Sequence, residues 1–308
     1  MVAWGTSGTI GDIYPSEEKH HSLVSPIKRR QSCVRSLVIF LSGVSLAAQL
    51  PAQTPAAKGP AAGSVFWTSQ AGGVKYRWTD QDLTATTAGA GKPAFSVVKA
   101  LKQEFGKPNG DNGYTYYEVT FMPVSAVGPL LSYERDDWWD GGAHPSGGES
   151  FVTVDVRSPG RPVLLTDLFD AAQIRQALLS DPIVQHVLTR EKIAPPPTLE
   201  GLAKALVGKE FGGENDMMYS FPEGLLSDFS FHHLEKGKVA VRLLLPHGSE
   251  IFRFHHTQLG LLLPIPASRK TAFQQAGSSE AGAMMQSLQR VKHSAKSSVV
   301  LQDRGAPK

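Results

Sequence analysis

The chain has 308 residues, a formal net charge of +3 and a single cysteine, Cys33. The net positive charge comes from the two ends, because the body at 53–276 holds 21 basic and 23 acidic residues. Nucleic-acid binding normally requires a basic patch, so this nearly neutral body argues against it. We therefore expect no nucleic-acid partner.

The N-terminal region has the three parts of a secretory signal peptide. Residues 28–35 carry four positive charges, residues 37–48 are mainly apolar, and small residues follow. The apolar run is shorter than the roughly 20 residues that a membrane-spanning helix needs, so cleavage is predicted over the alternative of an uncleaved anchor. We expect residues 1–48 to comprise an N-terminal extension and this signal peptide, which meets the membrane only transiently. The mature protein would then be periplasmic or extracellular.

Cleavage after the apolar run would also remove Cys33, and the mature chain would then have no disulfide, thiol nucleophile or thiolate metal site. Composition divides the rest of the chain into three parts. Residues 49–64 are rich in Ala, Pro, Gln and Gly, which is typical of a flexible spacer. A folded domain is predicted over 65–276. Residues 277–308 are rich in Ser, Lys and Gln, and we expect a mostly disordered tail there.

Hydrophobic periodicity predicts the elements of the folded domain. Alternating apolar and polar residues indicate strands, and apolar residues at helical spacing indicate helices. A loop rich in Asp, Trp and Gly is predicted after residue 133, and Asp170 is a predicted N-cap. Together the elements favour an α+β fold: one compact domain with a mostly antiparallel sheet and helices packed on one face. In chain order we expect strand 74–79, helix 94–105, strands 114–122, 127–133 and 151–156, helices 171–179, 182–188 and 199–207, and strands 229–234, 239–245 and 261–265.

Two motifs in this order carry a resemblance to a known family. Gly141-Gly142-Ala143-His144-Pro145 stands between two predicted strands, and Leu165-Thr166-Asp167-Leu168-Phe169 enters a predicted helix. Residues 237–246 and 260–266 resemble the last long strand and the closing strand of the same family. Over residues 65–275 the chain is similar to the RsiV-like extracytoplasmic domain, which forms the C-terminal part of the anti-sigma factor RsiV. A similar non-catalytic region precedes the catalytic domain of the peptidoglycan deacetylase PdaC.

The resemblance implies a binding role. RsiV is known for binding lysozyme, and this chain shows neither a sigma-binding segment nor a deacetylase domain in its sequence. We therefore expect an exported, non-enzymatic binding module of the cell envelope. Its partner would be an envelope protein such as lysozyme, or a cell-wall glycan, and no cofactor is expected.

The loop after residue 133 supplies the candidate binding residues. Indole rings can stack on sugars, carboxylates can accept hydrogen bonds from hydroxyl groups, and His144 can either contact a partner or hold the loop. Other interpretations remain open: one tryptophan can be a core anchor and the other a surface contact, and paired carboxylates can hydrolyse glycosides. The predicted partner-binding residues are Trp138, Trp139, Asp140, Gly141, Gly142, His144 and Pro145.

A metal-assisted envelope hydrolase is the alternative function. Five histidines lie within 25 residues, and imidazole suits Zn²⁺. Adjacent residues of a strand point to opposite faces, so only one histidine of each adjacent pair can join a site. No HExxH motif is present. We therefore predict no metal site, with His247 and His255 as weak candidates for one; the full set is His232, His233, His247, His255 and His256.

Overall fold

The computed structural model describes residues 63–106, 114–141, 145–212, 218–247, 256–278, 283–288 and 295–304. The chain divides into two units, Met1–Ala56 and Ala57–Lys308, and every described residue lies in the second. The predicted signal peptide, and the predicted spacer up to residue 62, lie outside the described residues. Among the described helices, none has both the length and the apolar character needed to cross a membrane.

The first sheet is an antiparallel meander. It contains β1 (Val65–Ala71), β2 (Val74–Thr79), β3 (Leu83–Thr87) and β4 (Phe95–Ser96), in that order. Strand β2 confirms the strand predicted at 74–79, because Val74, Tyr76 and Trp78 are buried and the residues between them point outward. Gly72 and Gly73 form the β1–β2 turn with φ of 56° and 76°. Two such residues in succession favour the tight hairpin turn that matches strand twist.

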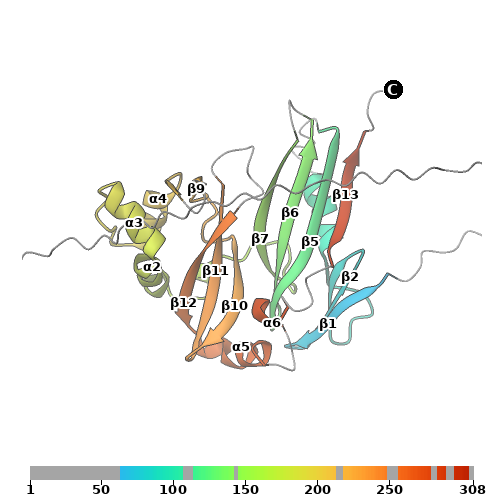
Figure 1. Ribbon diagram of the computed structural model, residues 1–308. Helices are drawn as coiled ribbons and strands as arrows, with labels where there is room; N and C mark the ends of the chain where they lie inside the picture. The colour runs from blue at the N-terminus through green and yellow to red at the C-terminus, as the bar shows by residue number, and fades with distance from the viewer. Residues whose placement is uncertain are drawn as a thin grey trace, which may run out of the picture. The chain divides into compact units, whose positions relative to one another are not determined.

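Helix α1 (Val97–Phe105) follows β4, and Ser96 caps it by accepting a hydrogen bond from the Lys99 backbone N–H. The helix leads into the second sheet, which contains β5 (Tyr116–Val127), β6 (Leu130–Asp140), β7 (Ser146–Asp155) and β13 (Ser297–Asp303). Its strand order is β13-β5-β6-β7, and Figure 1 shows β13 beside β5 although about 180 residues separate them in sequence.

Two expectations are corrected in this sheet. Most of the predicted Asp- and Trp-rich loop is strand, because β6 continues to Asp140 and pairs with β5 and β7 along its length. The predicted disordered tail does not hold for the described residues of 277–308, which form α6 (Met285–Leu288) and β13. Strand β13 is ordered by pairing with β5 and by burying Ser297.

The helical block matches its predictions closely. The 3-10 turn η1 (Leu165–Asp167) precedes α2 (Ala171–Ser180), α3 (Pro182–Arg190) and α4 (Leu199–Leu206). Asp170 caps α2 as expected, accepting hydrogen bonds from two backbone N–H groups of its first turn. Asp181 caps α3 in the same way, and Pro182 at its first position has no N–H to leave unsatisfied.

The third sheet contains β10 (Phe229–Glu235), β11 (Lys238–Pro246) and β12 (His256–Pro264). The predicted hairpin is confirmed, and its turn residues Lys236 and Gly237 have φ of 48° and 76°. A short two-stranded sheet, β8 (Glu210–Gly212) with β9 (Met218–Ser220), precedes it, and η4 (Ala267–Arg269) and α5 (Lys270–Ala276) follow.

The second and third sheets pack against each other through β10 and β11. Phe151 of β7, Val124 of β5, Leu244 of β11 and Met285 of α6 form one buried cluster at this contact. Among the described residues this contact lies near the β5–β6 turn, where the Thr153 hydroxyl of β7 donates a hydrogen bond to the Phe229 carbonyl of β10. The fold is thus α+β and mostly antiparallel, as predicted, but it is built from several sheets.

Candidate partner-binding face

The two adjacent tryptophans of β6 lie on opposite faces of the second sheet, because successive residues of a strand alternate. Trp138 is 40% exposed. Trp139 is half-buried on the other face, where its ring stacks on Tyr117 with a centroid distance of 6.1 Å and an interplanar angle of 11°. Trp139 is therefore an anchor of the fold, and Trp138 is the more exposed of the two.

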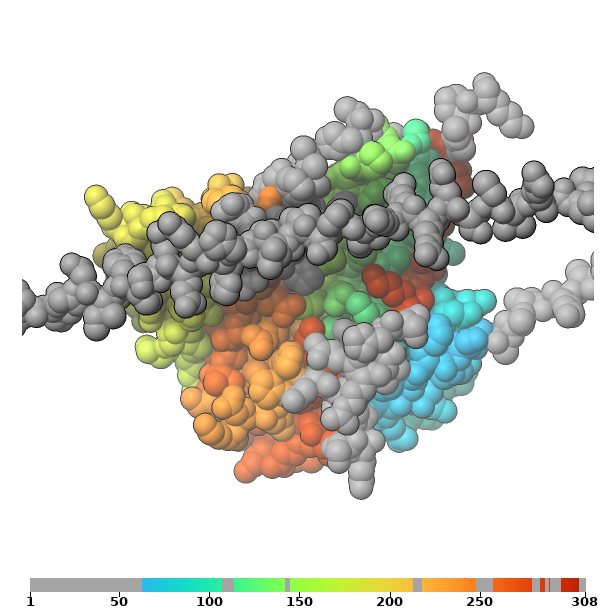
Figure 2. All heavy atoms as spheres, in the orientation of Figure 1, coloured from blue at the N-terminus to red at the C-terminus, as the bar shows by residue number. Residues whose placement is uncertain are grey.

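Acidic side chains surround Trp138 on the outer half of its face. Glu118 of β5 and Gly147 of β7 lie directly across from Trp138. On the β13 side, Val300 is 46% exposed and pairs with Glu118. In Figure 2 the green outer ends of these strands reach the surface. We call this surface the acidic face; its residues are Tyr116, Glu118, Thr120, Asp136, Trp138, Asp140, Gly147, Glu149, Ser298, Val300 and Asp303.

Hydrogen bonds and charges organise this face. The Tyr116 hydroxyl donates to Glu118 Oε2 at 2.9 Å, and this hydrogen bond raises the pKa of Tyr116. Asp136 lies across from Glu149 on β7. Burial and the neighbouring Glu149 carboxylate raise the pKa of Asp136, while Lys296, with its Nζ 3.8 Å from Asp136 Oδ2, opposes the rise. The face thus concentrates negative charge that a cationic partner would relieve.

The raised pKa of Asp136 gives a prediction for stability. At neutral pH the ionised Asp136 carboxylate has a higher free energy in the folded state than in the unfolded chain, so it lowers the stability of the fold. Below the ordinary Asp pKa the carboxyl group is protonated in both states, and this destabilisation disappears. We expect Asp136→Asn to raise the free energy of unfolding at pH 7 by about 0.5 kcal/mol, the scale of a like-charge cross-strand pair. Urea denaturation at pH 7 and at about pH 3 checks this, since the gain should vanish at the lower pH.

Asp140→Asn is the matched control, because Asp140 is exposed at the end of the same strand. A gain at pH 7 as large in Asp140→Asn as in Asp136→Asn would contradict the proposed role of burial and of Glu149.

The opposite face carries an ionic network beside Trp139, in which Arg135 and Asp137 are nearly buried. Arg135 donates to Asp137 through Nε at 3.0 Å and Nη2 at 2.8 Å, and to Glu104 of α1 through Nη1 at 3.0 Å. The Tyr117 hydroxyl also donates to Asp137, at 2.7 Å. Burial acts to lower the pKa of Arg135, but Asp137 and Glu104 outweigh it and raise the pKa. The network fastens α1 to β6 through the Arg135–Glu104 contact.

The predicted site residues are only partly brought together. Trp138 and Asp140 share the acidic face, Trp139 lies on the other face, and Gly141 and Pro145 are exposed in the β6–β7 connection. Gly142 and His144 lie outside the described residues. Sequence reasoning missed Glu118, Glu149 and Val300, because they join the site only through cross-strand pairing.

The histidines correct a geometric expectation. A β-bulge falls at His232, between Phe231 and His233, so the two adjacent imidazoles meet instead of pointing apart. Their Nδ1 atoms are 2.7 Å apart, and His233 Nε2 lies 3.8 Å from Glu235 Oε2.

Of the weak metal candidates, His247 is buried with its ring edge on Tyr219, and His255 lies outside the described residues. Within the described segments, no three His, Cys, Asp or Glu side chains are arranged to hold a metal ion.

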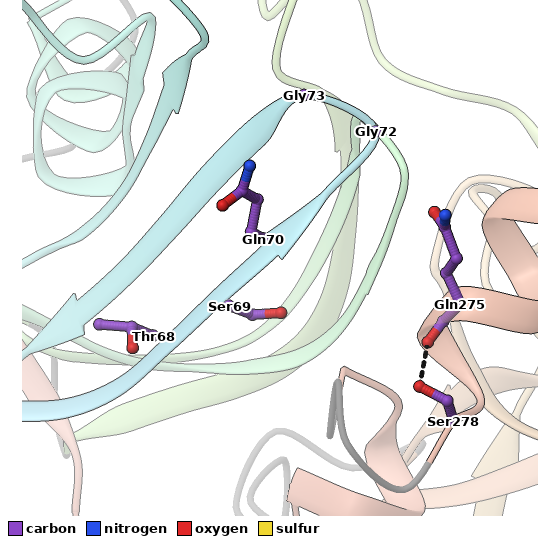
Figure 3. A pocket seen from close by; sticks show the side chains of 7 residues that line it. All are labelled: Thr68, Ser69, Gln70, Gly72, Gly73, Gln275 and Ser278. Atoms are coloured by element: carbon purple, nitrogen blue, oxygen red, sulfur yellow. Dashed lines mark hydrogen bonds between the residues drawn. The ribbon is translucent and has the colours of Figure 1, made fainter.

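A separate hollow lies between the β1–β2 turn and the end of α5 (Figure 3). Its lining is polar but contains no charged side chain, and Ser278 donates to the Gln275 backbone carbonyl at 2.8 Å. The described lining therefore supplies no acid or base group. The lining residues are Thr68, Ser69, Gln70, Gly72, Gly73, Gln275 and Ser278.

Comparison with known proteins adds no family to this geometry. No protein-family model matches the chain, and no curated protein matches its sequence. The resemblance to the RsiV-like domain therefore stays a prediction made from the two motifs.

Proposed function

We propose that this chain is an exported, non-enzymatic binding module of the cell envelope, of the RsiV-like type, and that its acidic face binds a basic protein. Lysozyme is the basic partner that the motif resemblance predicts. The module would act in the periplasm or outside the cell after signal-peptide cleavage. It would bind as a single compact domain without a cofactor, with its helices packed on one face.

One observation carries the proposal: the exposed Trp138 and Val300 stand among carboxylates on one sheet surface. An exposed indole is the side chain most enriched in binding hot spots. Its ring also attracts Lys and Arg side chains through cation–π contact. Surrounding negative charge speeds encounter with a basic protein and disfavours acidic ones.

Charge favours one of the two partner classes expected from the sequence. A neutral glycan would stack on Trp138 but would gain little from Glu118, Asp136 and Glu149 together. A basic protein uses both the apolar centre and the acidic surroundings. The charge of the acidic face therefore supports a protein partner over a neutral glycan.

The test is calorimetric titration of purified residues 53–308 with a basic lysozyme. We expect saturable binding that weakens as salt rises, because exposed charges are screened. Trp138→Ala should weaken binding by about 2 kcal/mol, as for a hot-spot side chain. Lys296→Ala should strengthen binding up to about fivefold, since it removes the cation that competes for Asp136.

Leu262→Ala is the matched control, because Leu262 is 42% exposed on β12 of the third sheet. Unchanged affinity in both Trp138→Ala and Lys296→Ala would contradict the assignment to the acidic face. Binding of purified wall fragments, but not lysozyme, through Trp138 would support the glycan partner instead. Stoichiometric Zn²⁺ that is lost on His247→Ala would support the hydrolase alternative.

A further inference from the structure

A groove of about 710 Å³ runs along the other face of the second sheet, beside β7. Figure 1 shows β7 as the edge strand of this sheet. Tyr133, Val152 and Val154 form its floor, because they share the face opposite to Trp138. Helix α1 supplies one wall, and residues 159–163 and 222–228 supply the rest. Its volume lies in the range of small-molecule sites.

The groove contains a hydroxyl group that has no hydrogen-bond partner among the described residues. Tyr133 is 4% exposed and lines the groove, and its hydroxyl is not one of the enclosed polar atoms, so the hydroxyl faces the open space of the groove. Burial raises the pKa of Tyr133 to about 12, so the hydroxyl stays protonated and can donate. A ligand that accepts a hydrogen bond from this hydroxyl would gain a direct polar contact on the floor of the groove.

The charged groups around the groove are already compensated. Glu104 pairs with Arg135 at 3.0 Å, and Arg161 pairs with Asp167 at 2.9 Å. Asp228 accepts a hydrogen bond from the Phe151 backbone N–H. A charged ligand would compete with one of these contacts, so the lining favours a neutral ligand.

The edge of β7 beside the groove is not open to an added strand. Asp228 caps the outward N–H of Phe151, and Val154 forms an isolated bridge with Pro162. An extended peptide that binds by strand addition needs these backbone groups. What the groove does offer is an apolar floor with the polar side chains of Gln103 and Ser150 at its edge.

We propose that this groove binds a neutral oligosaccharide, with sugar C–H groups on Val152 and Val154 and a sugar hydroxyl on Tyr133. Apolar floors with a few convergent polar groups are typical of small-ligand sites. The inference goes beyond the protein-binding role of the acidic face, because the two surfaces lie on opposite sides of one sheet. Each can therefore be tested without the other.

The experiment titrates residues 53–308 with cellotetraose, N-acetylchitotetraose and, as a charged probe of equal length, tetragalacturonate, followed by heteronuclear NMR. We expect saturable shifts with at least one neutral probe. Tyr133→Phe should weaken binding about fivefold to tenfold, the loss of one hydrogen bond. Ala100→Trp, which fills the groove from α1, should abolish binding.

Trp138→Ala should leave the affinity for the oligosaccharide unchanged, because Trp138 lies on the opposite face of the sheet. This variant therefore distinguishes failure of the groove proposal from failure of the acidic-face proposal. The melting temperature of each variant shows whether it is folded. Tyr133→Phe keeps all the hydrogen bonds found among the described residues, so we expect this variant to fold. It therefore still tests the groove if Ala100→Trp fails to fold. The inference is overturned if neither neutral probe binds at millimolar concentration, if tetragalacturonate binds more tightly than both, or if folded Tyr133→Phe binds with unchanged affinity.

Discussion

Deletion of residues 297–308 is expected to lower the free energy of unfolding by about 3–5 kcal/mol or to prevent folding. The deletion removes β13 and exposes the edge of β5. It also removes Ser297, whose Oγ accepts a 2.8 Å hydrogen bond from Trp78 Nε1 and donates to the Thr79 carbonyl. Trp78 is fully buried, so its N–H would be left unsatisfied at a cost of about 1–3 kcal/mol, in addition to the lost packing.

Urea denaturation of residues 53–308 against 53–296 measures this effect. Removal of residues 305–308 alone, which leaves β13 intact, is the control. The single variant Ser297→Ala isolates the hydrogen bond and should cost about 1–3 kcal/mol. If residues 53–296 unfold at the same urea concentration as the longer chain, β13 does not belong to the cooperative unit.

The failure to predict β13 has a physical cause. Val299 pairs with Val119, so the partner that orders the strand lies about 180 residues earlier in the chain. Local composition cannot show such a partner, and a Ser- and Lys-rich segment then resembles a disordered tail. Helix α2, in contrast, could be predicted because its N-cap and its inward-facing residues are all local.

The outer half of β6 was missed for a related reason. The sequence from Asp136 to Asp140 does not alternate apolar with polar residues. One face of β6 carries the ionic network there, and its other face belongs to the acidic face. The general expectation that one tryptophan is an anchor and the other a contact matches the half-buried Trp139 and the exposed Trp138. Which one is exposed, and which carboxylates lie beside it, depends on register. The β-bulge that joins His232 and His233 likewise has no signal in the residue types.

Substitution of Arg135 by Met is expected to destabilise the fold by about 3 kcal/mol, because it leaves Asp137 almost buried without its cation. The side chains of Arg135 and Asp137 are only 15% and 14% exposed, so solvent screens their charges poorly. The double variant Arg135→Met with Asp137→Leu should recover most of this loss, since apolar pairs often replace buried ion pairs with little change in stability.

A urea double-mutant cycle over Arg135 and Asp137 measures the coupling directly. Glu104→Gln is the matched control, because the Glu104 side chain is 58% exposed and should contribute less than about 1 kcal/mol. The cycle also separates the two faces of the sheet. Trp138→Ala should weaken binding of the protein partner and leave the free energy of unfolding nearly unchanged. Arg135→Met should lower the free energy of unfolding, while the molecules that remain folded bind the partner with nearly unchanged affinity. If Arg135→Met and the double variant are equally destabilised, the loss reflects packing of the Arg135 side chain and not an orphaned carboxylate.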